Sequence, residues 1–374
     1  MILMQCAVCA TELGLSLGKK CGRCSTRYCG PECQKQHWEG GGHDQLCKLI
    51  KKAGGAEQYY ANQKYAETVS VAAEVCAEDT KGQTCYICTE ALHWKTKEGL
   101  VRMCACRGTA GFAHVSCLAE QAKILVAEAE ENNRDNKVKN ERWSRWNRCS
   151  LCEQEYHGVV KCALGWACWK AYLGRPEEDG ARIMATNQLA NGLGAVRHHE
   201  AALSVKKAEL VMRQRLGDST ENLLALQSNI ATTYGKLGRT QDAMSMERDV
   251  YTGRLKLHGE EHPQTLRAAN NYASGLFDLE RFDEAKTLMR KTIPVSRQVF
   301  GDGHDLTLKM RWIYAAALSG DPSATLDDLR EAVATLEETE RIARRVFGGG
   351  HPLVVSIERE LEKSRAALRE APHS

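Results

Sequence analysis

The residues able to do chemistry in this chain are above all its cysteines. The sequence has 374 residues and 17 cysteines, and every cysteine lies at or before Cys168. Most stand in pairs separated by one to three residues, and two histidines stand at similar spacing to a cysteine. Thiolates and imidazoles brought together by a tight turn are ligands for zinc. In a reducing compartment such pairs are better explained as metal sites than as disulfides. The sequence therefore predicts structural zinc in the N-terminal half.

The first group of candidate ligands lies between residues 6 and 47. It consists of seven cysteines and one histidine: Cys6, Cys9, Cys21, Cys24, Cys29, Cys33, His43 and Cys47. Tetrahedral zinc takes four ligands, so eight ligands make two closed sites. Because so short a segment has too small a core to fold alone, zinc would supply the missing folding free energy.

The run from Tyr28 to Trp38 resembles the signature of the MYND zinc finger, a protein-interaction module. The resemblance implies that the ligand pairs interleave. Its two zinc sites are Cys6, Cys9, Cys29 and Cys33, and Cys21, Cys24, His43 and Cys47. His37 competes with His43 as the last ligand, and the family spacing to Cys47 favours His43. The resemblance also implies that Gln34 and Trp38 lie on a peptide-binding surface, although Trp38 could instead pack against the zinc-bound loops.

A second group of candidate ligands lies between residues 85 and 152. Its order is four cysteines, one histidine and three cysteines: Cys85, Cys88, Cys104, Cys106, His114, Cys117, Cys149 and Cys152. Again eight ligands suffice for two zinc ions, which makes four ions in the whole chain. Cys76, Cys162 and Cys168 have no partner at ligand spacing, and we expect them to be buried thiols without a catalytic role.

The second group resembles the RING-CH finger, through the one-residue gap between Cys104 and Cys106 and the run from His114 to Leu118. PHD fingers share the order of ligand types but usually have a longer gap there. The resemblance implies two cross-braced sites, one of Cys85, Cys88, His114 and Cys117, and one of Cys104, Cys106, Cys149 and Cys152. It further implies that Ile87 contacts a ubiquitin-conjugating enzyme. At Gln121 the family usually has a tryptophan, so part of that contact is missing.

The cysteine-free half of the chain is repetitive. Gly217, Gly259 and Gly301 are each 42 residues apart, and His262 and His304 repeat at the same interval. Such a period predicts a solenoid of stacked helix pairs. The pattern from Gly259 to Ala285 resembles the 42-residue TPR class of kinesin light chains, over roughly residues 175–371. We expect the histidines to serve in turns rather than to bind metal.

These features predict a mainly α fold, with two small binuclear zinc modules followed by an α-solenoid of helix-pair repeats. The expected segments are a MYND-type finger at 6–47, a helical linker at 48–84, a RING-CH-type finger at 85–152, a connecting helix at 153–174 and a TPR-like solenoid at 175–371. Each zinc site would be filled by four protein ligands, which leaves no coordination position for catalysis.

Two functions are compatible with this organisation. The first is a RING-CH-type ubiquitin ligase, which positions a charged ubiquitin-conjugating enzyme and has no nucleophile of its own. The second is a non-enzymatic scaffold of zinc fingers and TPR repeats. In both, the solenoid and the MYND finger bind proteins or peptides. The net charge of +3 gives no support to nucleic-acid binding, and no apolar run is long enough for a membrane helix. No secretory signal precedes Cys6, so we expect a cytoplasmic or nuclear protein.

Overall fold

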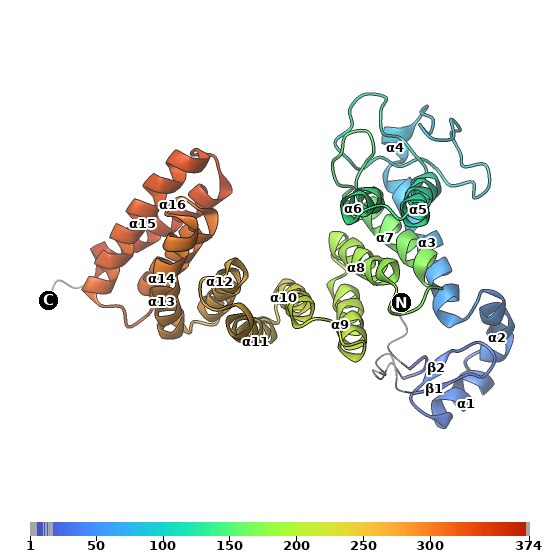
Figure 1. Cartoon of the computed structure of the whole chain (residues 1–374), viewed down its shortest axis with the longest axis horizontal. Coiled ribbons are helices and arrows are strands. Elements are labelled where there is room, and N and C mark those ends of the chain that lie inside the picture. Colours follow the sequence, from blue (N-terminus) through green and yellow to red (C-terminus); the bar gives the residue numbers. More distant parts are fainter. Residues whose placement is uncertain (1–5, 10, 12, 14–17, 372–374) are drawn as a thin grey trace. The chain divides into compact units, whose positions relative to one another are not determined.

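The computed structural model describes residues 6–9, 11, 13 and 18–371. The chain is mainly helical and divides into two compact units, Met1–Asp218 and Ser219–Ser374 (Figure 1). The predicted fold class, zinc-ligand modules followed by a TPR-like solenoid, is confirmed. The finer division into five segments stays a prediction.

The first unit begins with a small finger. Strands β1 (Lys19–Lys20) and β2 (Arg27–Tyr28) pair antiparallel, with Lys19 opposite Tyr28. Helices α1 (Pro31–Glu39) and α2 (His43–Lys52) follow. Tyr28 and Ile50 are the large side chains fully buried in this finger, and the rest of its core consists mostly of cysteines. So small an apolar core is consistent with a fold that depends on metal.

The remainder of the first unit is a helical frame around the second group of cysteines. Its elements are α3 (Ala56–Val75), α4 (Ala77–Thr80), α5 (Val115–Glu131), α6 (Asn136–Trp143), the 3-10 helix η1 (Ser144–Trp146), α7 (Gly158–Tyr172), α8 (Gly180–Ala195) and α9 (His199–Arg215).

Helices α3 and α7 form part of the core of the second cysteine module. Val69 of α3 and Leu164 of α7 are buried in one cluster with Phe112 and the ligand Cys149. The opposite face of α7 packs on α8, where Gly165 and Gly192 let the two backbones approach closely. A Cβ atom at Gly192 would lie 2.9 Å from the carbonyl oxygen of Lys161. The segments expected to be a linker and a connecting helix therefore support the module from two sides.

Residues 128–142 mix acidic and basic side chains, a pattern that predicts one solvated helix, but the structure has two helices in this segment. Helix α5 ends at Glu131, and Asn133 takes a positive φ of 46°. Asp135 then starts α6, because its carboxylate accepts the backbone N–H of Val138 at 2.9 Å. A left-handed asparagine followed by an aspartate N-cap is a strong local signal for breaking a helix.

The second unit consists of seven antiparallel helices that stack in chain order within the described residues (Figure 1). They are α10 (Thr220–Lys236), α11 (Thr240–His258), α12 (Pro263–Asp278), α13 (Phe282–Phe300), α14 (Asp305–Gly320), α15 (Leu326–Phe347) and α16 (Pro352–Glu370). Helix α13 runs uninterrupted through Pro294.

The repeated histidines serve the turns between repeats, as expected. His262, His304 and His351 are the N-cap residues of α12, α14 and α16, and in each the Nδ1 atom accepts a backbone N–H at 3.2 Å. The glycines that precede them share one unusual backbone conformation. Gly301 has φ 88° and ψ 165°, so it is extended with positive φ and is not a left-handed αL cap. That conformation is open almost only to glycine, which explains the periodic glycine.

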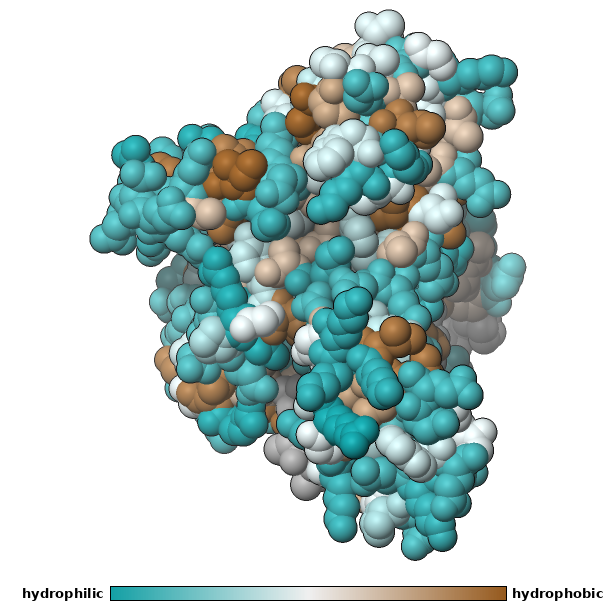
Figure 2. Space-filling view, turned by 90° about the vertical axis from the view of Figure 1, so that its right-hand side faces the viewer, coloured by the Kyte–Doolittle hydropathy of each residue, from teal (hydrophilic) through white to brown (hydrophobic). Residues whose placement is uncertain are grey.

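No helix among the described residues is long and apolar enough to cross a membrane. On the face of the molecule in Figure 2, hydrophobic side chains form small separate groups among hydrophilic ones. The apolar patches on this face are therefore small.

Candidate metal centres and interaction surfaces

The structure brings the sixteen candidate ligands into four clusters. In each cluster the potential ligand atoms all lie within 4.8 Å of one another. The clusters are Cys6, Cys9, Cys29 and Cys33; Cys21, Cys24, His43 and Cys47; Cys85, Cys88, His114 and Cys117; and Cys104, Cys106, Cys149 and Cys152. These are the same four sets that the two resemblances imply, and the number of zinc ions bound stays a prediction.

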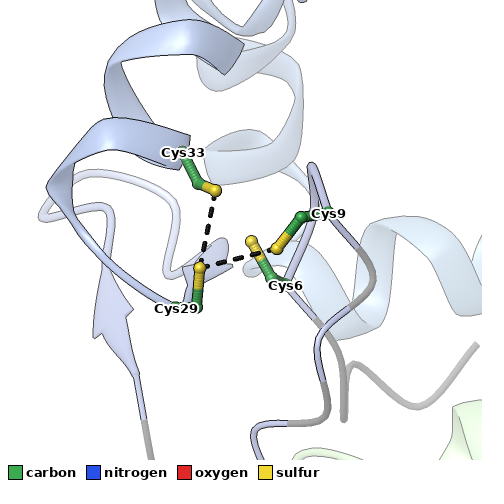
Figure 3. A group of neighbouring side chains, drawn as sticks. All are labelled: Cys6, Cys9, Cys29 and Cys33. Atoms are coloured by element: carbon green, nitrogen blue, oxygen red, sulfur yellow. Dashed lines mark hydrogen bonds between the residues drawn. The ribbon is translucent and has the colours of Figure 1, made fainter.

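The first cluster joins a loop to the start of a helix (Figure 3). Cys6 and Cys9 come from the loop, Cys29 follows β2, and Cys33 lies in the first turn of α1. The Sγ atom of Cys29 lies 3.5 Å from that of Cys9 and 3.4 Å from that of Cys33. A disulfide would bring two sulfurs to about 2 Å. Sulfurs around tetrahedral zinc, with bonds of about 2.3 Å, lie roughly 3.8 Å apart. The spacing therefore fits four thiolates around one ion.

The second cluster is completely buried and decides between the two candidate histidines. Helix α2 presents His43 and Cys47 one turn apart, and the Nε2 atom of His43 lies 3.4 Å from the Sγ atom of Cys24. His37 lies outside the cluster, because its Nδ1 atom is 3.0 Å from the hydroxyl of Tyr28. Burial lowers the pKa of His43 and keeps the imidazole neutral, the form that binds a metal.

Among the described residues, the cysteine pairs that begin at Cys21, Cys85 and Cys149 share one tight turn, here called the knuckle. The backbone N–H of the first cysteine donates to the carbonyl five residues later, at 2.8 Å for Cys21, 3.0 Å for Cys85 and 3.0 Å for Cys149. The residue four positions after the cysteine donates back to the cysteine carbonyl and has a positive φ. This geometry points both side chains of a Cys-x2-Cys pair to one side, so a single ion can bind both.

The third cluster fixes the orientation of its histidine. The Nδ1 atom of His114 lies 3.4 Å from the Sγ atom of Cys88 and 3.6 Å from that of Cys117. Its Nε2 atom lies 3.4 Å from the carbonyl oxygen of Ala91, so the proton belongs on Nε2 and the lone pair on Nδ1 faces the thiols. Burial lowers the pKa of His114 and so favours this neutral form.

The fourth cluster depends on a glycine that spacing arguments overlooked. The Sγ atoms of Cys106 and Cys149 are 3.7 Å apart, and Gly111 passes directly behind Cys106. A Cβ atom at position 111, where φ is +85°, would lie 2.6 Å from the Cβ atom of Cys106. Only glycine fits, and the sequence signal was the run Gly108-Thr109-Ala110-Gly111 directly after the second pair.

All four donor sets fit zinc, and each set supplies four protein ligands. Sets of four thiolates, or of three thiolates and one imidazole, are typical of closed structural zinc sites. Such zinc, when bound, contributes folding free energy and does no chemistry. The three remaining thiols, Cys76, Cys162 and Cys168, are buried, and burial raises the pKa of Cys162 to about 11. A buried protonated thiol is a poor nucleophile.

The four predicted contact residues lie at least partly on the surface. Trp38 on α1 is 42% exposed, Gln34 is partly exposed on the same helix, and Ile87 is 36% exposed at the tip of its knuckle. Gln121 is half-buried on α5. The sequence reasoning overlooked Leu151, which is 52% exposed at the matching position of the Cys149 knuckle.

A hydrogen bond joins the two knuckles that carry Ile87 and Leu151. The hydroxyl of Tyr86 lies 3.0 Å from the hydroxyl of Ser150, and each of these residues directly precedes one of the exposed apolar residues. The backbone N–H of Ile87 and that of Leu151 also make equivalent 3.4 Å hydrogen bonds to the Sγ atom of their own first cysteine. The two zinc-ligand loops that carry these apolar tips are therefore joined by a side-chain hydrogen bond.

The comparisons with known proteins agree with the two outer parts of the chain. Residues 6–47 match the MYND finger family, and residues 223–264 and 265–305 match a tetratricopeptide repeat family. Among solved structures, a Podosopora anserina protein with nearly identical kinesin-light-chain-type TPR-like repeats is 17% identical, with a TM-score of 0.42; the match covers 63% of this chain and 98% of that one. BtubC (BKLC) from P. vanneervenii is 13% identical, with a TM-score of 0.43, and the match covers 68% of this chain and 88% of that one. No curated protein matches the sequence.

The RING-CH type of residues 85–152 stays a prediction, because the support there is the pair of ligand clusters. The chain therefore combines a MYND finger with tetratricopeptide repeats, and it is a zinc-binding protein-interaction protein.

Proposed function

We propose that this protein is a RING-CH-type ubiquitin ligase that holds four zinc ions. In this proposal residues 85–152 recruit a charged ubiquitin-conjugating enzyme, and the solenoid or the MYND finger recruits the substrate. The protein supplies proximity and orientation, which convert transfer between two partners into a step within one complex. Because the many thiolates need a reducing compartment, we place this activity in the cytoplasm or nucleus.

The observation that carries the proposal is the pair of knuckle tips. Ile87 and Leu151 are exposed on two zinc-ligand loops that the Tyr86–Ser150 hydrogen bond holds together. The RING-CH resemblance implies a shallow apolar docking surface between the two zinc loops, and these side chains supply one. Such a surface is rigid before binding, so little conformational entropy is lost when a partner docks.

One observation favours the second candidate, the non-enzymatic scaffold. Gln121, a half-buried amide on α5, stands where the resemblance implies an aromatic anchor. Buried aromatic anchors carry much of the binding energy of an interface. Without this anchor the contact with the conjugating enzyme should be weak, so any ligase activity should be slow.

An autoubiquitination assay with a panel of conjugating enzymes tests the proposal. We expect slow chain formation by the wild type, little or none by Ile87→Ala or Leu151→Ala, and faster formation by Gln121→Trp. Leu49→Ala is the matched control, because Leu49 is equally apolar and 53% exposed but lies on α2, outside residues 85–152. If the wild type and Gln121→Trp are both inactive with every conjugating enzyme, the scaffold function replaces the ligase.

A further inference from the structure

One further turn of the first unit has the backbone geometry of a knuckle but carries no cysteine. The backbone N–H of His93 donates to the carbonyl of Glu98 at 3.0 Å, the N–H of Lys97 donates to the carbonyl of His93 at 2.9 Å, and Lys97 has a positive φ of 61°. These are the three features of the metal-ligand knuckles at Cys21, Cys85 and Cys149. Residues 92–97 are here called the His93 turn.

Hydrogen bonds replace the metal in the His93 turn. Thr96 stands where the second cysteine of a knuckle would be, and its N–H and its hydroxyl lie 3.1 and 2.9 Å from the Nδ1 atom of His93. The carboxylate of Glu98 accepts the hydroxyl of Thr96 at 3.1 Å. The turn is thus closed by its own side chains and needs no ion.

The base of the turn is fastened to the second cysteine module. His93 is only 8% exposed, and its ring packs edge-on against the ligand His114 with centroids 5.4 Å apart. Glu98 also accepts the N–H and the hydroxyl of Ser116, at 2.7 and 2.8 Å, at the start of α5. The tip of the turn is therefore held rigidly in place.

The tip itself is apolar, aromatic and basic. Trp94 is 68% exposed and Leu92 is 58% exposed, the two highest values among the exposed large hydrophobic residues of the described chain. Lys95 and Lys97 are exposed beside them, and residues 91–97 contain no acidic side chain, although Glu90 and Glu98 flank the turn. In the Cys85 and Cys149 knuckles the position equivalent to Trp94 is occupied by Tyr86 and Ser150, which bond to each other. Trp94 instead points its ring at solvent.

We infer that the His93 turn is a docking site for an acidic segment of a partner protein that carries at least one apolar side chain. The apolar side chain packs on Trp94 and Leu92, and the carboxylates lie against Lys95 and Lys97. A tryptophan on a pre-ordered turn buries a large area at little entropic cost. The flanking lysines select acidic partners and exclude basic ones. This site is separate from the proposed ligase function and does not depend on it.

Selection of random peptides displayed on phage against the 374-residue chain tests this inference. We expect acidic peptides with an apolar residue to be enriched. In fluorescence anisotropy, Trp94→Ala should weaken binding of an enriched peptide by at least about tenfold. The double variant Lys95→Ser with Lys97→Ser should weaken it by several-fold at low salt and by less at high salt.

Matched controls separate this site from other surfaces. Trp38→Ala removes the exposed tryptophan of the MYND finger, and Lys51→Ser with Lys52→Ser removes another exposed lysine pair on α2. Neither should change the affinity. Zinc content and thermal unfolding of Trp94→Ala should match the wild type, because Trp94 is mostly exposed and is not a ligand.

Several results would overturn the inference. One is an absence of acidic peptides among the selected sequences, and another is equal binding of those peptides by Trp94→Ala. A third is loss of binding in Trp38→Ala, which would locate the peptide on the MYND finger. A dimer in sedimentation that Trp94→Ala dissociates would make the occupant a second copy. Trp94-dependent binding of a single-stranded oligonucleotide in place of peptides would make it a nucleic acid.

Discussion

The ring of His304 stacks on the ring of Phe300 with centroids 4.4 Å apart, while its Nδ1 atom accepts the backbone N–H of Leu306 at 3.2 Å. The His304 side chain thus packs on the end of α13 and caps the start of α14, so it joins two consecutive helix pairs of the solenoid. The same arrangement recurs at His351, which stacks on Phe347 at 4.6 Å. The periodic histidine is therefore a structural joint between repeats.

This joint predicts the outcome of two substitutions at His304. His304→Ala removes both the cap and the stacking, and we expect it to lower the free energy of unfolding by about 1–2 kcal/mol. His304→Asn keeps a capping side chain and loses only the stacking, so its loss should be about half as large. Chemical denaturation followed by circular dichroism measures both. If the two variants lose the same free energy of unfolding, the cap contributes nothing to the stability of the protein.

The metal centres predict about four zinc ions per chain, because four clusters each supply four ligands. Elemental analysis of the purified protein measures the ratio. Cys29→Ser, which removes one ligand of the first cluster, should lower the ratio by at least one ion and leave the helical signal of the second unit intact. A wild-type ratio of about two or fewer would refute the assignment.

The close approach of Gly111 to Cys106 means that the fourth cluster should require glycine at position 111. Gly111→Ala forces a Cβ atom to within 2.6 Å of Cys106, so we expect the loss of about one zinc ion and at least about 2 kcal/mol of stability. Gly82→Ala is the control, since Gly82 also has a positive φ, of 74°, but its Cβ would meet nothing within 4 Å. That variant should lose only about 1 kcal/mol and keep its zinc. Similar losses in both variants would show that the contact with Cys106 does not matter.

The buried carboxyl group of Glu247 should make the stability of the second unit depend on pH. This carboxyl group lies on α11 and is buried, which raises its pKa to about 7 although hydrogen bonds from Ser228 and Asn271 oppose the change. Because the pKa is higher in the folded state than in the unfolded state, the stability from this group is present below about pH 4.5 and is lost as the pH rises through about 7.

The test compares the wild type with Glu247→Gln across this pH range. Relative to the variant, the wild type should lose on the order of 2 kcal/mol between pH 4.5 and pH 8. Thermal unfolding at several pH values measures the difference. If the difference in stability between the wild type and Glu247→Gln stays constant over that pH range, the pKa of Glu247 is not raised.

The sequence was most informative where ligands repeat at short spacing. The four ligand sets and the turn role of His262 followed from local patterns and family resemblance, since a Cys-x2-Cys pair closes its own turn. The His93 turn escaped prediction because it has the backbone of a metal knuckle without a metal ligand pair. Nothing in the sequence near Tyr86 or Ser150 indicated that they meet, because 64 residues separate them. The packing of α3 and α7 around the second module likewise depends on long-range contacts.

In the proposed function, the knuckle tips that carry Ile87 and Leu151 activate a charged ubiquitin-conjugating enzyme. The most direct measurement is the rate at which ubiquitin is discharged from the enzyme thioester to free lysine, with and without this protein. We predict a faster discharge with the wild type, the basal rate with Ile87→Ala, and an unchanged stimulation with Leu49→Ala. The proposed ligase function would be contradicted if the zinc-loaded wild type and Gln121→Trp both leave the discharge at the basal rate, for every conjugating enzyme tested.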